Sequence, residues 1–267
     1  MNNTASSKGT VYLEKDAAVA RLYVSNPDRY NAMSLSMWRE LKQIVAVAEQ
    51  DPEVRVLLLL GAGNKAFVSG ADISEFGNAR ETPRQIAEYA IAVHEAQYAL
   101  SACTKPVVAG IQGVCMGGGL GLMLACDLRY CAHNTRFRMP AALLGLGYDV
   151  AGLQRMVDMI GAARATDLFF TARTFDGLEA ERINLVNQSF AAEDFNWKLN
   201  EITAEIAQNA PLTLHATKLA LRHILGDPNV KNVAKVNEAV QACFASLDYQ
   251  EGQRAFAEKR QPRFKGV

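Results

Sequence analysis

The sequence lacks most features of a secreted, metal-binding or nucleic-acid-binding protein. Its five cysteines form no C-x-x-C pair and no cluster with the four histidines, so we expect reduced thiols, a reducing compartment and no metal site. Lysine plus arginine number 28, as do aspartate plus glutamate, which leaves no basic excess for a nucleic-acid partner. No apolar run reaches the ~20 residues of a membrane helix, and the start MNNTASSKGT lacks a secretory apolar segment. We expect a cytoplasmic protein with no membrane partner.

Familiar hydrolase motifs are also missing. There is no G-x-S-x-G segment and no H-E-x-x-H pair. Ser69 and Cys115 are possible nucleophiles, but neither has a base beside it in the sequence, so we interpret both as structural. Any chemistry must come from groups that the fold brings together.

The order of sequence patterns predicts an α/β protein with a helical C-terminal part. The chain has 267 residues, of which 49% are hydrophobic and 21% charged, enough for one large core. Strand and helix patterns alternate up to about residue 190, and helical patterns follow. We expect a flexible N-terminus over 1–10, a core over 11–195 and a helical region over 196–267.

Three local predictions bear on the site. VYLEKDAAVARLYVS (11–25) predicts two strands around a turn at Lys15-Asp16, and Ser34 or Ser36 can cap a helix that ends near Gln50. A second helix is predicted from Pro83 to Cys103. Its apolar line follows helical spacing and consists of Ile86, Ala90, Val93, Gln97 and Leu100.

The segment GAGNKA (61–66) fits the dinucleotide pattern G-x-G-x-x-A. A dinucleotide turn must lead into a helix that holds the pyrophosphate. The residues that follow, FVSGAD, do not predict a helix. A glycine-rich loop is the better interpretation, and a nicotinamide enzyme is only a third option.

The segment CMGGGLGLMLACD (115–127) has the clearest potential for chemistry. Gly117, Gly118 and Gly119 follow a buried strand, predicted over 105–114, and open a helix. Backbone N–H groups at such a helix start are unpaired and lie at the positive end of its dipole. They could hold a carbonyl oxygen that becomes negative during a reaction. A tight packing turn explains these glycines equally well.

Several segments together resemble the crotonase (enoyl-CoA hydratase/isomerase) superfamily. They occur in family order along most of the chain: NPDRYNAMS, VRVLLLLGAGNKAFVSGADISEF, KPVVAGIQGVCMGGGLGLMLACDLRY, LGLGYDVAGLQRMVDMIG, FTART and EGQRAFAEKRQPRFKG. The resemblance implies a spiral of ββα turns with a C-terminal helical trimerisation region. It implies a homotrimer or a hexamer made of two trimers.

The resemblance also implies an acyl-CoA substrate and particular contacts. Coenzyme A would be part of the substrate, and no separate cofactor is expected. The oxyanion hole would be the backbone N–H groups of Ala71 and Gly118. The adenine would lie against the backbone of Ser69, Ala71 and Ile73. Further candidate contacts to the nucleotide and its phosphates are Arg29, Phe256 and Lys259.

Two positions depart from the hydratase pattern of this superfamily. Hydratases use two glutamates for proton transfer. In this sequence the first position is Gly121 and the second, in FRMPA, is Ala141. Because neither residue can transfer a proton, the chain is not expected to be a two-glutamate hydratase.

Asp149 and His94 are the candidate replacements. Asp149 matches an aspartate of the dienoyl-CoA isomerases and the 4-chlorobenzoyl-CoA dehalogenases, and His94 matches a histidine of the dehalogenases, twelve residues before Pro106. The alternatives are that Asp149 caps a helix and that His94 is structural or exposed. The tryptophans of the dehalogenases are missing here, since Val93 and Ala141 take their places.

These residues lead to two hypotheses. The first is an enzyme that forms an acyl-CoA enolate for isomerisation or hydrolytic chemistry, with hydration as the remaining possibility. Asp149 would be its base or nucleophile, and His94 a second acid–base group. The second is a catalytically degenerate acyl-CoA-binding protein that has kept the fold.

Overall fold

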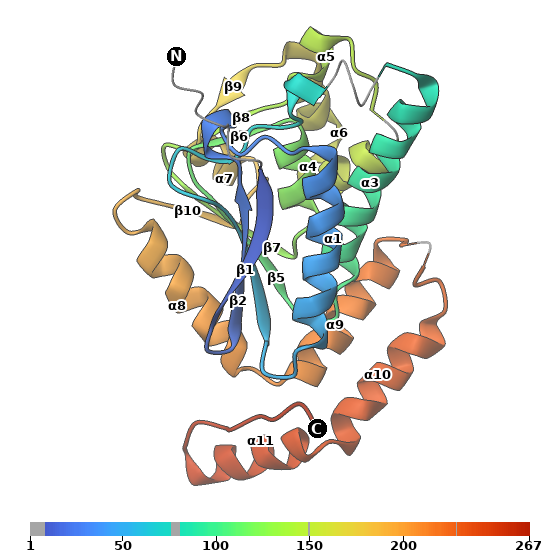
Figure 1. Ribbon diagram of the computed structural model, residues 1–267. Helices are drawn as coiled ribbons and strands as arrows, with labels where there is room; N and C mark the ends of the chain where they lie inside the picture. The colour runs from blue at the N-terminus through green and yellow to red at the C-terminus, as the bar shows by residue number, and fades with distance from the viewer. Residues whose placement is uncertain (1–8, 76–80, 149, 228) are drawn as a thin grey trace.

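A computed structural model describes residues 9–75, 81–148, 150–227 and 229–267 of the chain. Its centre consists of two sheets that are mainly parallel (Figure 1). The larger has the strand order β1 (Thr10–Asp16), β2 (Val19–Ser25), β3 (Val56–Gly61), β5 (Val107–Ile111), β7 (Leu128–Ala132), β10 (Gln188–Phe190). The smaller has the order β4 (Ala66–Val68), β6 (Val114–Met116), β8 (Arg136–Arg138), β9 (Thr174–Phe175).

Successive chain segments place one strand in each sheet and then a helix. This happens in β3–β4–α3, in β5–β6–α4 and in β7–β8–α5, in which the helices are α3 (Pro83–Ala102), α4 (Gly118–Leu124) and α5 (Ala141–Leu144). Within each sheet these strands are parallel to their neighbours from the previous turn. The predicted spiral of ββα turns is therefore confirmed.

The N-terminal hairpin forms as predicted, but its turn lies two residues later. Lys15 and Asp16 end β1, and Asp16 pairs with Val19. The turn residue Ala17 has a φ of 51°, so the chain reverses through the left-handed region at this point. The prediction of a turn at Lys15-Asp16 was wrong because both residues still pair with β2.

Helices cover both faces of the larger sheet. The helices α1 (Leu35–Gln50), α3, α4 and α6 (Val150–Thr171) enclose the main core on one face, whereas α8 (Phe195–Gln208) packs on the other through Phe195 and Leu199 (Figure 1). Ser34 caps α1, since its Oγ accepts from Met37 N at 3.2 Å. The predicted division at residue 196 thus falls within a helix that packs on the sheet.

The apolar line predicted for α3 was wrong in part. Its buried residues are Tyr89, Ala92, Ala96 and Leu100, whereas Ile86 is 52% exposed. Two of these four buried residues are alanines, which gave little periodic signal. Consequently Gln97 lies on the flank of α3 instead of in its apolar line.

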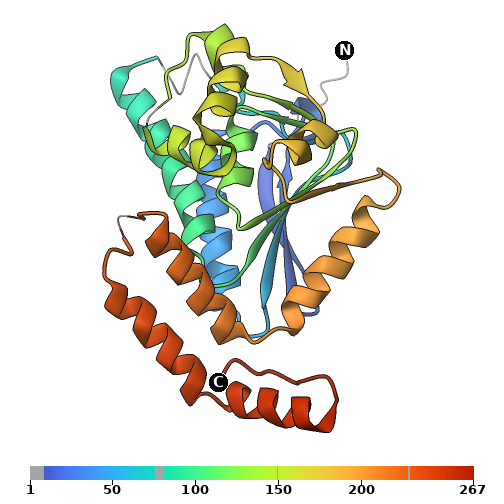
Figure 2. The same ribbon diagram turned by 180° about the vertical axis from the view of Figure 1, so that it is seen from behind.

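The C-terminal helices form an arm beside the core (Figure 2). They are α9 (Pro211–Ile224), α10 (Val233–Ala245) and α11 (Leu247–Glu258). Lys218 anchors α9, because its buried Nζ donates to Asp127 Oδ2 at 2.7 Å and to the Lys105 carbonyl at 3.1 Å. Within the described residues, no helix combines the length and the apolarity that a membrane span requires.

Candidate active site

The glycine turn before α4 fits tightly between two strands of the smaller sheet. Gly117 has a φ of 49°, which residues with side chains rarely adopt. A Cβ on Gly119 would lie 2.2 Å from the Val68 carbonyl oxygen of β4. Gly117 N donates to the Arg138 carbonyl of β8 at 3.1 Å. Two of the three glycines are thus required by the backbone path and its contacts.

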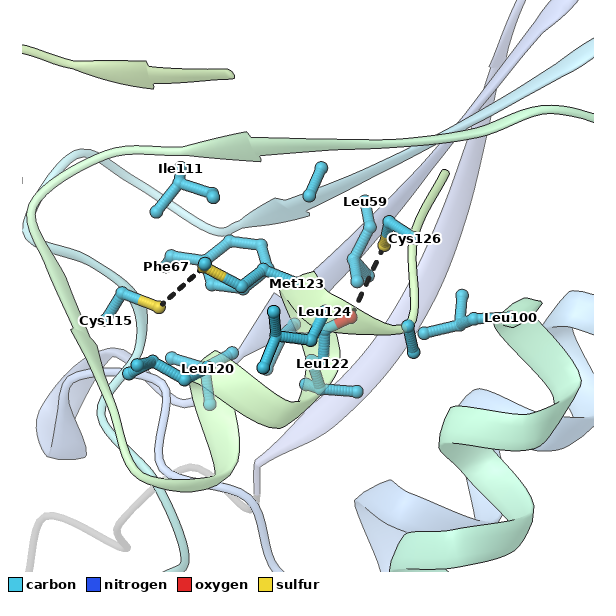
Figure 3. Packing of buried hydrophobic residues seen from close by; sticks show 14 of the residues in the cluster. Leu59, Phe67, Leu100, Ile111, Cys115, Leu120, Leu122, Met123, Leu124 and Cys126 are labelled. Carbon is cyan, nitrogen blue, oxygen red and sulfur yellow. Dashed lines mark hydrogen bonds between the residues drawn. The ribbon is translucent and has the colours of Figure 1, made fainter. Parts of the chain in front are cut away.

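The helix that follows is fixed by apolar packing on the sheet (Figure 3). Leu120, Leu122 and Met123 are fully buried. Cys115 is also fully buried, and its Sγ lies 3.8 Å from Met123 Sδ. Burial also raises the pKa of the Cys115 thiol well above its usual value. The prediction that Cys115 is buried is confirmed.

The segment from Ser69 to Asp72 lies beside the glycine turn and pairs with Met33. Met33 N donates to the Gly70 carbonyl at 2.8 Å, and Asp72 N donates to the Met33 carbonyl at 2.9 Å. This pairing leaves the Ala71 N–H without an acceptor among the described residues. A Cβ on Gly70 would lie 3.8 Å from Gly118 N.

Gly118 N, the first amide of α4, likewise has no acceptor in the described part of the chain. A Cβ on Gly118 would lie 3.8 Å from the Gly70 carbonyl carbon, which is bonded to Ala71 N. The free N–H groups of Ala71 and Gly118, one from each segment, therefore lie close together. Such a pair can hold an oxygen atom that gains negative charge during a reaction.

Trp38 braces both segments: it contacts the glycine turn directly and reaches the segment from Ser69 to Asp72 through Tyr89 and Met33. Its Nε1 donates to Tyr89 Oη at 2.8 Å, and Tyr89 Oη donates to the Met33 carbonyl at 3.1 Å. The ring edge of Trp38 lies 3.3 Å from the position of a Cβ on Gly118. Sequence reasoning missed this brace, because its members lie on three elements and share no motif.

A buried charge lies next to Ala71, at the edge of the candidate site. We call this edge the rim, and it consists of Arg29, Ser69, Ala71, Asp72 and Ile73. Asp72 is 9% exposed, and its Oδ1 accepts from Ser74 Oγ at 2.7 Å and from Arg29 Nη1 at 2.9 Å. Burial alone would raise the pKa of Asp72, but the hydrogen bonds from Ser74 and the charge of Arg29 outweigh it and lower the pKa. Asp72 is therefore ionised and ties the rim to η1 (Pro27–Arg29).

Four of the six predicted CoA contacts lie at this rim. Ser69 Oγ donates to the Arg29 carbonyl at 3.1 Å. Ile73 begins η2 (Ile73–Glu75) and is 67% exposed. The other two, Phe256 and Lys259, lie on and just after α11, which both ribbon views place at the opposite end of the molecule (Figures 1 and 2). A single chain does not bring all six predicted contacts together.

The structure describes only one of the two candidate acid–base residues. Asp149 lies outside the described residues. His94 is exposed on α3, and its ring stacks on Tyr98 with centroids 6.4 Å apart. Ala141 is buried at the start of α5. A Cβ on Gly121 would lie 2.5 Å from Gln97 Nε2.

Two cavities of about 620 and 520 Å³ lie elsewhere, beside α8. Arg21 and Asn200 line both, and neither contains a candidate residue. The paired N–H groups of Ala71 and Gly118 lie outside both cavities. Among the described residues, no group of three or more histidine, cysteine, aspartate or glutamate side chains could hold a metal ion.

Known proteins resemble nearly the whole chain. Residues 14–267 match a family model described as enoyl-CoA hydratase/isomerase. The crotonyl-CoA hydratase of Syntrophomonas wolfei is 32% identical over 254 residues, which cover 95% of this chain and 97% of that protein. The peroxisomal Delta(3,5)-Delta(2,4)-dienoyl-CoA isomerase of Arabidopsis thaliana is 34% identical over 263 residues, with 93% of each chain covered. A solved structure, an enoyl-CoA hydratase/carnithine racemase from Magnetospirillum magneticum, has a TM-score of 0.91 at 32% identity and covers 98% of this chain and 97% of its own.

Proposed function

Because this chain belongs to the enoyl-CoA hydratase/isomerase family and has the crotonase fold, we propose that it is an enzyme acting on an acyl-CoA thioester. The observation that carries this proposal is the pair of free N–H groups at Ala71 and Gly118. The thioester oxygen would accept from both. One such donor typically contributes ~3 kcal/mol to transition-state stabilisation.

The proposed reaction proceeds through the enolate that these N–H groups stabilise. Gly121 and Ala141 supply no carboxylate, which argues against the two-glutamate route to hydration. Isomerisation of a double bond, or hydrolytic chemistry, fits better, with Asp149 as base or nucleophile and His94 as second acid–base group or water activator. The relatives named above include both a hydratase and an isomerase, so hydration by another route is the remaining reaction.

The proposed CoA site needs more than one copy of the chain. Arg29, Ser69 and Ile73 would bind the nucleotide end of CoA from the rim of one subunit. Phe256 and Lys259 would come from α11 of a neighbour, because α11 lies at the opposite end of its own chain (Figure 1) and Phe256 is 87% exposed. We therefore propose a homotrimer or a hexamer of two trimers.

Sedimentation tests this assembly. Exposed apolar side chains on the arm support it, among them Leu221, Ile224, Phe244 and Leu247. We expect a trimer or hexamer at micromolar concentration, and Phe256→Ser with Lys259→Ser to weaken CoA-ester binding. A stable monomer that binds CoA esters fully would contradict the assembly.

A substrate screen tests the reaction. Enoyl-, dienoyl-, 3-oxoacyl- and aryl-CoA esters are offered to the enzyme, and products are followed by chromatography. Calorimetry measures binding of the same esters. We expect binding of several esters and turnover of at least one. No binding of any CoA ester would contradict the proposed function.

A catalytically degenerate CoA-binding protein is the second candidate. The loss of both glutamate positions, at Gly121 and Ala141, favours it. The same screen separates the two candidates, because a binding protein would show affinity in calorimetry but no turnover of any ester class.

A further inference from the structure

Gln97 occupies the space above Gly121. Its Nε2 lies 2.5 Å, its Cδ 3.4 Å and its Oε1 3.8 Å from the position of a Cβ on Gly121. The carboxamide thus lies where a side chain at position 121 would begin. A polar group from α3 replaces a side chain that α4 lacks.

The amide of Gln97 has hydrogen-bonding capacity to spare. It makes no hydrogen bond within the described residues, and Gln97 is half-buried. Every fully buried side-chain nitrogen or oxygen in that part of the chain has a partner, so the amide must reach solvent-accessible space. An amide offers two donors and one acceptor oxygen. A bound molecule that covered it without pairing would incur its desolvation cost.

The amide lies close to the free N–H of Gly118. Gly121 follows Gly118 by three positions on α4, a rise of about 4.5 Å. An acyl group whose carbonyl oxygen is held at Gly118 would therefore have its first few carbons within reach of Gln97. Because a carboxamide does not exchange protons at neutral pH, its contribution would be selective recognition of the substrate.

We propose that Gln97 is a specificity-determining residue, which hydrogen-bonds a hydroxyl or carbonyl oxygen near the thioester of the acyl group. This inference rests on the proposed acyl-CoA function. The amide recognises either oxygen, because it can donate to both and accept from a hydroxyl. An acyl chain without such an oxygen leaves the amide unpaired.

Calorimetry with two ligands tests the inference. 3-Hydroxybutyryl-CoA and butyryl-CoA differ only in the oxygen, and Gln97→Met keeps the length of the side chain but removes its amide. Loss of one hydrogen bond should weaken 3-hydroxybutyryl-CoA binding about fivefold, with butyryl-CoA changed less than about twofold. Gln43→Met, at an exposed position of α1, is the matched control and should change neither.

Two failures are distinguishable. If the unaltered protein binds neither ester, the proposed function fails and the inference fails with it. If both esters bind and Gln97→Met leaves the ratio of their affinities unchanged, only the inference fails. Unchanged butyryl-CoA binding also shows that the variant is folded.

Discussion

The two halves of the candidate site differ in the chemical groups that they contain. One half consists of main-chain N–H groups, at Ala71 and Gly118, held by glycines and by Trp38. The other half, where family hydratases keep two glutamates, has Gly121 and Ala141. The difference separates a main-chain half, which glycines hold in place, from a side-chain half that lacks both carboxylates. The predictions below test whether the halves are separable.

Replacing Asp149 by asparagine is expected to have the largest effect. A positioned acid or base contributes about 10²- to 10⁴-fold to the rate, and an amide cannot transfer the proton. kcat on the substrate found in the screen should fall by that factor, while calorimetry shows little change in affinity. Full turnover of the variant would exclude Asp149 from the proton-transfer half.

Restoring both carboxylates should create hydration. Gly121→Glu alone would meet the Gln97 amide, so the variant combines Gly121→Glu and Ala141→Glu with Gln97→Ala. We expect hydration of crotonyl-CoA, followed by absorbance, to rise at least about tenfold over the unaltered protein. The matched control carries glutamine at 121 and 141. A folded carboxylate variant no better than this control would contradict the positional argument.

Two glycines of α4 should differ in stability. Gly119→Ala would press a Cβ against the Val68 carbonyl, whereas Gly121→Ala would meet only the end of the flexible Gln97 side chain. We expect about 1–3 kcal/mol of destabilisation for Gly119→Ala and less than about 1 kcal/mol for Gly121→Ala. Urea unfolding measures both, and equal losses would show that the turn is not packed as described.

Asp72→Asn should have a small effect, and it should depend on pH. The folded-state pKa of Asp72 lies below its ordinary 3.8, so its ionised form adds stability above that pH. This contribution is lost as pH falls through the folded-state pKa. Unfolding free energies at pH 7 should favour the unaltered protein by about 1 kcal/mol, and the difference should shrink below pH ~3.8. A pH-independent difference would contradict the role of this charge.

Local patterns in the sequence predicted the alternation of strands and helices and the free helix start, whereas the ββα spiral was predicted only through the family resemblance. Buried strands and glycines succeed each other in a fixed order, and Ser34 marks the start of α1 where the structure has it. The free amide of Gly118 follows from a helix start alone. Its partner, Ala71, was predicted only through the family resemblance.

What the sequence could not predict are contacts between distant segments. Gln97 and Gly121 lie 24 positions apart and share no motif, so their contact emerges only when α3 packs beside α4. The same holds for the hydrogen bonds that join Trp38, Tyr89 and Met33. The sequence also could not show that α11, which carries Phe256, lies at the opposite end of the molecule from the rim (Figure 1).

The most direct test of the account removes one N–H group. Gly118→Pro deletes the donor at the first position of α4, where a helix tolerates proline, and Gly118→Ala keeps the donor while adding a Cβ near Trp38. With the substrate found in the screen, we expect kcat of the proline variant to fall about 10²- to 10³-fold. The alanine variant should stay within about tenfold of the unaltered enzyme. Equal kcat values for the proline and alanine variants would contradict the oxyanion hole.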